Sequence, residues 1–188
     1  MRLLLYGSRD FAATVGELAR HCGHEVVGRV DDYDTGPEII GPFDRVLESH
    51  PPADYGFALA IGYNNLPARW AAWQRLRAAG YRLPPLIHPR AYVADSAHIS
   101  EGAMVMAGAI VDVRVSIDEA AVLWPAVCVN HDAYIGANTF LSPSVTVCGH
   151  ARIGAHSFIG AGSIIVDHGA VPEASFLSMQ TRYTERHT

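Results

Sequence analysis

Aliphatic residues recur every six positions through the second half of the chain. The series runs from Ile87 to Leu177 without a break, and all sixteen of its members are Ile, Val or Leu. Four residues after each member stands a residue that is nearly always small, as at Ala91, Ala103 and Ala121. Because side chains alternate along a strand, positions an even number of residues apart face the same side. The pattern therefore predicts short strands that bury one aliphatic and one small residue per hexad.

A six-residue step of this kind is typical of a parallel β-helix, in which each hexad forms one short face and three faces make one coil. We expect about five coils between residues 83 and 182, with residues 183–188 left as a C-terminal tail. Residues eighteen positions apart, such as Val111, Val129 and Val147, then stack above one another. A single hexad buries too little to be stable alone, so neighbouring coils stabilise each other. By analogy with other hexapeptide-repeat proteins, we also expect a homo-oligomer, most simply a homotrimer.

Residues 1–82 follow a different pattern, in which apolar strands alternate with helices. The strands are expected at residues 2–6, 25–30 and 55–61, and the helices at about 10–22, 43–49 and 67–79. Asp10 is expected to cap the first helix, and Gly23 stands just past its end. Alternating strands and helices predict an α/β domain with a parallel, right-handed βαβ sheet. The stiff segment 82–85, Arg-Leu-Pro-Pro, marks the junction between the two domains.

Polar and glycine residues follow the strands of this first domain, where parallel sheets bind ligands. They form a candidate nucleotide pocket that consists of Gly7, Ser8, Asp31, Asp32, Gly62, Tyr63 and Asn64. The first turn lacks the second and third glycines of a dinucleotide fingerprint, which disfavours NAD. From the pattern alone, a solvated turn with a helix cap is the simpler interpretation of Asp31 and Asp32.

Charge and composition exclude several classes of protein. The chain has no Lys, and its 14 basic side chains are all Arg against 19 acidic ones, for a net charge of -5. This balance disfavours a nucleic-acid surface, and the absence of Lys excludes a Walker-type phosphate loop. The apolar stretches are far too short for a membrane span or a secretory signal, so we expect a cytoplasmic protein. Its three cysteines, Cys22, Cys128 and Cys148, fit reduced and largely buried thiols.

Ten histidines raise the question of a metal site. A zinc site on a β-helix needs three converging imidazoles, two of them about one coil apart. His131 and His150 are nineteen residues apart and His150 and His156 only six, so the spacing is poor and no metal is expected. His150, His156 and His168 each follow an inward aliphatic residue by three positions, which predicts exposed places at the corners of the coils.

His131 is the strongest catalytic candidate from the residues themselves. It follows the inward Val129 by two positions, which predicts an outward place on a flat face, and Asp132 is next to it. An imidazole beside a carboxylate is the usual arrangement for a general base. One coil further on stands Gly149, which allows close approach and offers its amide N–H to a developing oxyanion.

Taken together, these residues resemble the bacterial nucleotide-sugar acetyltransferases of the sialic-acid O-acetyltransferase-like type, which include bacillosamine and perosamine N-acetyltransferases. The resemblance covers nearly the whole chain. It rests on Tyr6-Gly7-Ser8, on Asp31-Asp32, on residues 60–64 and 86–89, and on residues 129–132 followed by Ile135-Gly136.

The resemblance implies a Rossmann-like N-terminal domain that holds a nucleotide sugar, followed by a left-handed β-helix that forms trimers. Acetyl-CoA then lies in the groove between two prisms, and the acceptor is a UDP-, GDP- or dTDP-linked amino sugar. By position, His131 matches the base, Asp132 the acid that assists it, and the Gly149 amide serves the oxyanion. Asp31 and Asp32 match residues that hold the nucleotide, and Gly7, Ser8, Gly62, Tyr63 and Asn64 line the same pocket.

Three departures from the family pattern keep other functions open. Arg9-Asp10-Phe11 replaces the glycine-rich half of the first turn, so Arg9 is the expected pyrophosphate contact. Phe140 stands where some members have a second histidine, and the usual Gly-Asn-Pro-Ala ending is missing. The alternatives are O-acetylation of a sugar hydroxyl and a non-catalytic trimeric scaffold.

Overall fold

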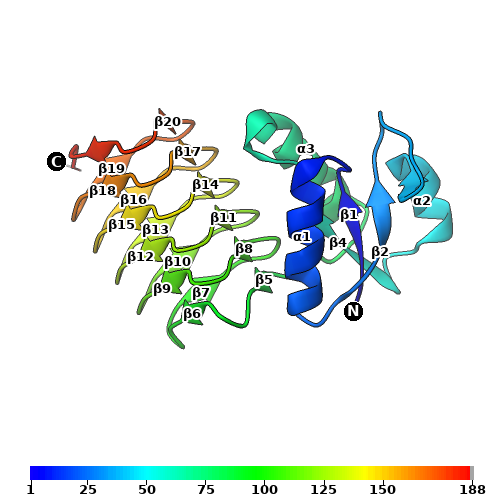
Figure 1. The fold of residues 1–188 in the computed structure, drawn as a ribbon, viewed down its shortest axis with the longest axis horizontal. Coiled ribbons are helices and arrows are strands. Elements are labelled where there is room, and N and C mark those ends of the chain that lie inside the picture. Colours follow the sequence, from blue (N-terminus) through cyan, green and yellow to red (C-terminus); the bar gives the residue numbers. More distant parts are fainter. Residues whose placement is uncertain (187–188) are drawn as a thin grey trace. The chain divides into compact units, whose positions relative to one another are not determined.

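The structure, a computed structural model, describes residues 1–186 and divides into two compact units (Figure 1). The first unit is Met1–Leu86 and the second begins at Ile87. The boundary lies four residues after the one expected from the sequence. Residues just before it belong to the first unit because Arg82 pairs with Gly56 beside the sheet and Leu83 is fully buried.

The second unit is a parallel β-solenoid of about five turns, as the hexads predict (Figure 1). Each hexad contributes a strand of two residues, and the strands form three parallel sheets. One sheet contains β5 (Leu86–Ile87), β8 (Met104–Val105), β11 (Val122–Leu123), β14 (Phe140–Leu141), β17 (Phe158–Ile159) and β20 (Phe176–Leu177). Another contains β6 (Tyr92–Val93), β9 (Ile110–Val111), β12 (Cys128–Val129), β15 (Thr146–Val147), β18 (Ile164–Ile165) and β21 (Arg182–Tyr183). The third contains β7 (His98–Ile99), β10 (Ser116–Ile117), β13 (Tyr134–Ile135), β16 (Arg152–Ile153) and β19 (Ala170–Val171).

The register of these sheets confirms the eighteen-residue coil. Val129 pairs with Val111 on one side and with Val147 on the other, so each aliphatic residue stacks on its equivalents in adjacent coils. The inward aliphatic and small residues form one continuous core, from Ala103 to Val171. Buried apolar ladders of this kind supply the stability that no single hexad has.

The corners between successive faces of the coils have a left-handed backbone conformation. Fourteen residues at six-residue intervals from Gly102 to Gln180 have φ between 55° and 71°. Only three of them are glycine, and the others include Asp132, His150 and His168. Because this conformation is unfavourable for most L-residues, the corners are held by the stacking of the coils around them.

The first unit is a four-stranded parallel sheet in the order β3-β2-β1-β4, with helices between its strands (Figure 1). Its strands are β1 (Arg2–Tyr6), β2 (Glu25–Val30), β3 (Ile39–Gly41) and β4 (Tyr55–Leu59). Its helices are α1 (Asp10–His21), α2 (Phe43–Ser49), the short 3-10 helix η1 (Tyr63–Asn65) and α3 (Leu66–Ala78). The parallel βαβ arrangement is confirmed, whereas the short edge strand β3 was missed.

The helix ends differ from expectation at one place. The prediction that Asp10 caps α1 is wrong, because the helix begins at Asp10 and the preceding Arg9 makes no side-chain cap. The carboxylate still lies in the first turn, where negative charge favours the helix dipole. Gly23 follows the helix with φ +77°, and its amide donates to the Arg20 carbonyl at 3.0 Å. Asn65 caps α3 by accepting a 3.0 Å hydrogen bond from the Ala68 amide.

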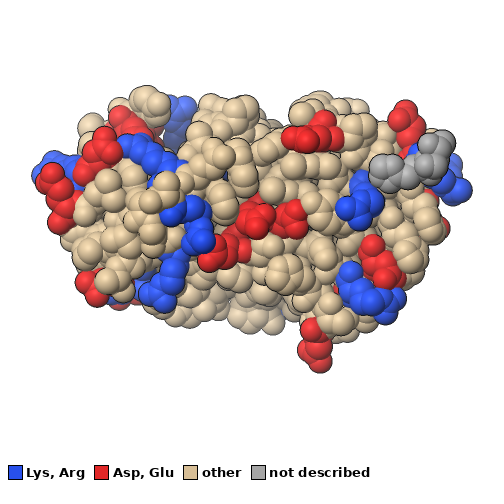
Figure 2. Space-filling model, turned by 180° about the vertical axis from the view of Figure 1, so that it is seen from behind, with Lys and Arg blue, Asp and Glu red and all other residues tan. Residues whose placement is uncertain are grey.

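The surface shows arginine and carboxylate side chains close to one another on the face drawn in Figure 2. Several form ion pairs, such as Arg29 with Glu38 at 3.0 Å. The three cysteines are free thiols and partly buried. Within residues 1–186, no helix has both the length and the apolar character needed to cross a membrane.

We expect the inward ladder to dominate the stability of the solenoid. Ile153 is fully buried on β16, so Ile153→Ala removes apolar contacts and should lower the free energy of unfolding by about 2–5 kcal/mol. Arg152, its neighbour on the same strand, is exposed, and Arg152→Ala should cost less than about 1 kcal/mol. Urea denaturation measures both, and equal losses would contradict the inward assignment.

Candidate active site

One corner of the solenoid gathers most of the chemistry of the second unit. The eighteen-residue repeat stacks Arg114, Asp132, His150 and His168 at this corner, and His131, Gly149 and Asp167 immediately precede the last three of them. We call these seven residues the corner cluster. Backbone hydrogen bonds hold its coils in register: the His150 amide donates to the His131 carbonyl at 3.1 Å, and the His168 amide to the Gly149 carbonyl at 3.0 Å.

The prediction that His131 lies on a flat face is wrong. The strand β12 ends at Val129, and His131 lies in the turn that leads to the corner residue Asp132, whose φ is 62°. Alternation along a strand does not extend through a turn, so counting by two from Val129 gave the wrong place. The turn leaves the His131 side chain 48% exposed, which makes it accessible to a substrate.

His131 and Asp132 form the expected pair. The Nδ1 atom of His131 lies 2.9 Å from Oδ2 of Asp132. A carboxylate at this distance favours the tautomer with the proton on Nδ1, which leaves the Nε2 lone pair as the base. The geometry is therefore that of a general base oriented by an acid.

Asp132 is also held from its other side by an arginine. Arg114 donates from Nε to Oδ1 at 2.7 Å and from Nη2 to Oδ2 at 2.8 Å, a two-pronged pair. The hydrogen bonds from Arg114, and then the one with His131, hold the pKa of Asp132 well below its usual range. The carboxylate therefore stays ionised over the whole pH range in which an imidazole titrates.

Gly149 provides the space that His131 occupies. A Cβ atom at this position would lie 2.7 Å from Cε1 and 2.9 Å from Nε2 of His131, distances that are too short for a side chain. Among the described residues, the Gly149 amide forms no hydrogen bond, so its N–H is available to an oxyanion.

Two further histidines belong to the corner cluster, and the sequence analysis treated them only as exposed corner residues. The His150 ring lies 5.2 Å from the His131 ring, edge to face, and 4.7 Å from the His168 ring, which stacks on it. His168 Nδ1 lies 2.7 Å from Oδ2 of Asp167, which forms a second His–Asp pair. Their spacing from Asp132, eighteen residues for His150 and twice that for His168, could have revealed them, because such positions share a corner.

Three residues of the corner cluster are close enough together to bind one metal ion. Donor atoms of His131, Asp132 and His150 all lie within 4.8 Å of one another. Both oxygens of Asp132 already accept hydrogen bonds from Arg114, so the carboxylate is committed to a cation. His156, the third histidine considered for a metal site in the sequence analysis, lies at another corner. There its Nδ1 atom is 3.2 Å from Nδ2 of Asn138.

The carboxyl edge of the first sheet brings the other predicted residues together. The Gly7 amide donates to Val30 and the Ala60 amide donates to Tyr6, so the ends of β1, β2 and β4 lie side by side. Ser8 donates to Oδ2 of Asp31 at 2.7 Å, and the Asp34 amide donates to Oδ1. Gly62 precedes η1, and η1 contains Tyr63, which is 46% exposed, and Asn64. Arg9 pairs with Asp34 at 3.1 Å.

Asp32 has a structural function at this edge. Its Oδ2 accepts from the Tyr6 hydroxyl at 2.6 Å and from Arg75 at 2.8 Å, and its Oδ1 accepts from the Phe43 amide at 2.8 Å. The last bond stabilises the first turn of α2, so the helix-cap alternative is correct for Asp32. Partial burial raises the pKa of Asp32, but the hydrogen bonds from Tyr6, Phe43 and Arg75 outweigh burial and lower it.

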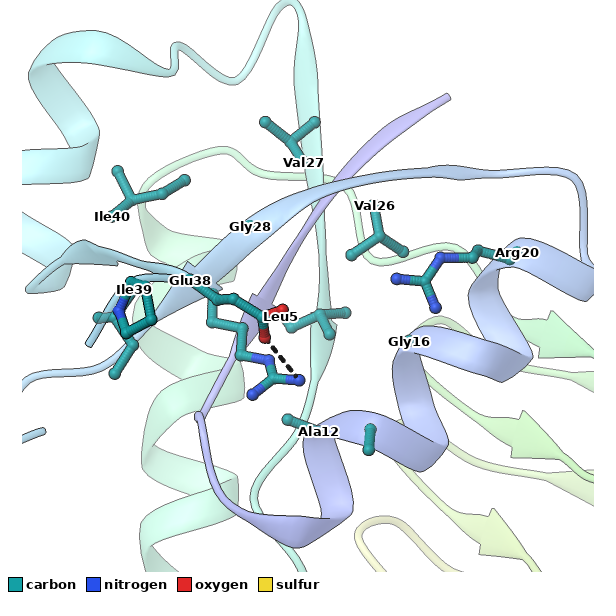
Figure 3. A pocket seen from close by; sticks show the side chains of 13 residues that line it. Leu5, Ala12, Gly16, Arg20, Val26, Val27, Gly28, Glu38, Ile39 and Ile40 are labelled. Carbon is teal, nitrogen blue, oxygen red and sulfur yellow. Dashed lines mark ion pairs between the residues drawn. The ribbon is translucent and has the colours of Figure 1, made fainter. Parts of the chain in front are cut away.

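A cavity of about 390 Å³ opens elsewhere in the first unit (Figure 3). It lies between α1 and the strands β2 and β3, and its lining includes Gly16, Arg20, Gly28, Glu38 and Ile40. No residue of the predicted nucleotide pocket lines it. The cavity is thus distinct from the carboxyl edge.

Comparisons with known proteins agree with the solenoid. Residues 132–167 match the family model of the bacterial transferase hexapeptide (six repeats). The acetyltransferase domain of PglB from Neisseria gonorrhoeae, solved with acetyl coenzyme A, is 28% identical with a TM-score of 0.89, and the match covers 98% of this chain and 91% of that one. The chain is an acyltransferase with hexapeptide repeats. A variant of perosamine N-acetyltransferase from Caulobacter crescentus, solved with CoA and GDP-perosamine, is 27% identical with a TM-score of 0.77, over 95% of this acyltransferase and 93% of that chain.

We expect Asp32 to make the stability of this acyltransferase sensitive to acid. Because its pKa is lower in the folded chain than its usual value of 3.8, the ionised carboxylate stabilises the fold above that pH. This stabilisation is lost as the pH falls through the folded pKa. Asp32→Asn should therefore lower the urea midpoint at pH 7, and the difference should shrink as the pH falls below 3.8. Asp54→Asn, at an exposed turn, is the control, and a pH-independent difference for Asp32→Asn would contradict this assignment.

Gly149→Ala should displace the His131 ring of the acyltransferase. The added Cβ would contact the imidazole at under 3 Å, and a misplaced base should lower kcat/KM by about 10- to 100-fold. Gly36→Ala, where the nearest atom is the end of the Ile39 side chain at 3.7 Å, should leave activity unchanged. Unaltered kinetics in Gly149→Ala would show that close approach at this glycine is not needed.

Proposed function

We propose that this acyltransferase transfers an acetyl group from acetyl-CoA to the amino group of a nucleotide-linked sugar. The observation that carries the proposal is the juxtaposition of His131, Asp132 and the Gly149 amide at one corner. The similar PglB domain was solved with acetyl coenzyme A, and the similar perosamine N-acetyltransferase with CoA and GDP-perosamine, which supports both substrate classes.

The reaction follows from the roles that these groups can take. Nε2 of His131 accepts a proton from the sugar amine while the nitrogen attacks the thioester carbonyl carbon. The carbonyl oxygen becomes an oxyanion, which the Gly149 N–H stabilises, and Asp132 stabilises the imidazolium. When the tetrahedral intermediate collapses, the C–S bond breaks and the CoA thiolate takes the proton from His131. The products are the amide and CoA thiol, and no covalent enzyme intermediate is required.

In this proposal the carboxyl edge of the first unit holds the nucleotide, as in a Rossmann-like domain. The polar residues there are the half-buried Ser8 and the exposed Arg9, Tyr63 and Asn64, with Gly7 and Gly62 giving close backbone approach. Asp31 orients Ser8 and can accept a further hydrogen bond. In this proposal Asp32 shapes the edge through Tyr6, Arg75 and α2.

The proposal extends to assembly and location. The solenoid is a left-handed β-helix that forms a homotrimer in the cytoplasm, and CoA lies between two prisms. Exposed apolar side chains on the β6-β9-β18 sheet, Tyr92, Ile110 and Ile164, support self-association.

The test is CoA thiol release from acetyl-CoA with a panel of UDP-, GDP- and dTDP-linked amino sugars. One nucleotide sugar should give turnover, and His131→Ala should lower it at least about 100-fold because the base is lost. His98→Ala, an exposed histidine on β7, should retain full activity.

Other outcomes would overturn parts of the proposal. Full activity in His131→Ala would show that His131 is not the base. Turnover only with sugars that carry a free hydroxyl and no amine would make the enzyme an O-acetyltransferase. If calorimetry shows no binding of acetyl-CoA, the non-catalytic trimeric scaffold is the alternative that remains.

A further inference from the structure

Arg114 has a specific relation to the base that the proposed chemistry does not use. It lies one coil before Asp132 at the same corner, with φ 57°, and its amide donates to the Ser96 hydroxyl at 3.1 Å. Its guanidinium contacts both oxygens of Asp132. The side chain is 63% exposed, so core packing does not account for its conformation.

The two-pronged contact fixes the carboxylate that orients His131. Oδ2 of Asp132 is shared, at 2.8 Å from Nη2 of Arg114 and 2.9 Å from Nδ1 of His131. Oδ1 contacts Nε of Arg114 at 2.7 Å. A carboxylate held at both oxygens cannot rotate freely about χ2, so the direction that it presents to His131 is set by Arg114.

We propose that Arg114 is a positioning residue, which clamps Asp132 in the orientation that holds His131. This inference rests on the proposed function of His131 as the base. The sequence offers no indication of it except the interval of eighteen between Arg114 and Asp132.

Several other charged groups surround His131. His150 lies beside its ring and Asp167 lies beyond Gly149, paired with His168. Further out, Asp112 acts on Arg114 and Arg186 acts on Asp167. None of these contacts both oxygens of Asp132, so only Arg114 combines charge with orientation.

Two variants separate charge from geometry. Arg114→Gln removes both the charge and the planar fork, so kcat should fall by about tenfold with little change in KM. Arg114→Lys keeps the charge but lacks the planar fork, so its kcat should fall as well.

A double-mutant cycle tests whether Arg114 acts through Asp132. In the Asp132→Asn background, Arg114→Gln should lower kcat by less than about twofold, because the group it positions is already lost. A full additional loss would show that Arg114 acts independently of Asp132 and would overturn the proposal.

A readout that does not need turnover separates this inference from the proposed function. In proton NMR spectra recorded at one pH, the signals of the His131 ring should move in Arg114→Gln, because the carboxylate that orients the ring is no longer held at both oxygens. Arg152→Gln, which replaces an exposed arginine 4.3 Å from the centre of the Tyr134 ring, is the matched control and should leave these signals and kcat unchanged.

The outcomes are distinguishable. Displaced His131 signals in an Arg114→Gln protein whose parent transfers no acetyl group would support the role of Arg114 and remove the proposed function. Unchanged signals and an unchanged kcat in Arg114→Gln would overturn the inference while acetyl transfer stands. A lower melting temperature with an unchanged kcat would make Arg114 structural only, which also overturns the inference.

Discussion

The stacking of coils at intervals of eighteen residues is the constraint on which the rest of the second unit depends. Each inward aliphatic residue contacts its equivalents one coil above and below, as Val129 does with Val111 and Val147. Because burial is continuous along these ladders, the register cannot slip without exposing a whole row of apolar side chains. The corners are therefore fixed to the same interval, although they contribute almost nothing to the core.

The corner cluster follows directly from that constraint. Stacked corners bring together groups that are far apart in sequence, and the left-handed conformation at Asp132 directs its carboxylate toward both His131 and Arg114. Three imidazoles, two carboxylates and a guanidinium lie along about four coils. Such crowding of opposite charges on a rigid scaffold is typical of a site that controls protonation.

Much of the architecture could be predicted from the sequence, because period and composition report burial directly. The hexads predict the solenoid, and the alternation of strands and helices predicts the parallel sheet. The place of His131 was wrong because the two-residue strand ends at Val129, and β3 was missed because three residues carry too weak a pattern. The roles of Arg114 and Arg75 depend on partners 18 and 43 positions away, which only the fold brings together.

The most direct test of this account is a crystal structure of the protein with CoA and a nucleotide-linked amino sugar bound together. We predict the sugar nitrogen at about 3 Å from Nε2 of His131, with the Gly149 N–H directed at the position of the thioester oxygen. A structure in which the CoA sulfur and the sugar amine lie at a different corner, out of reach of His131, would contradict this account.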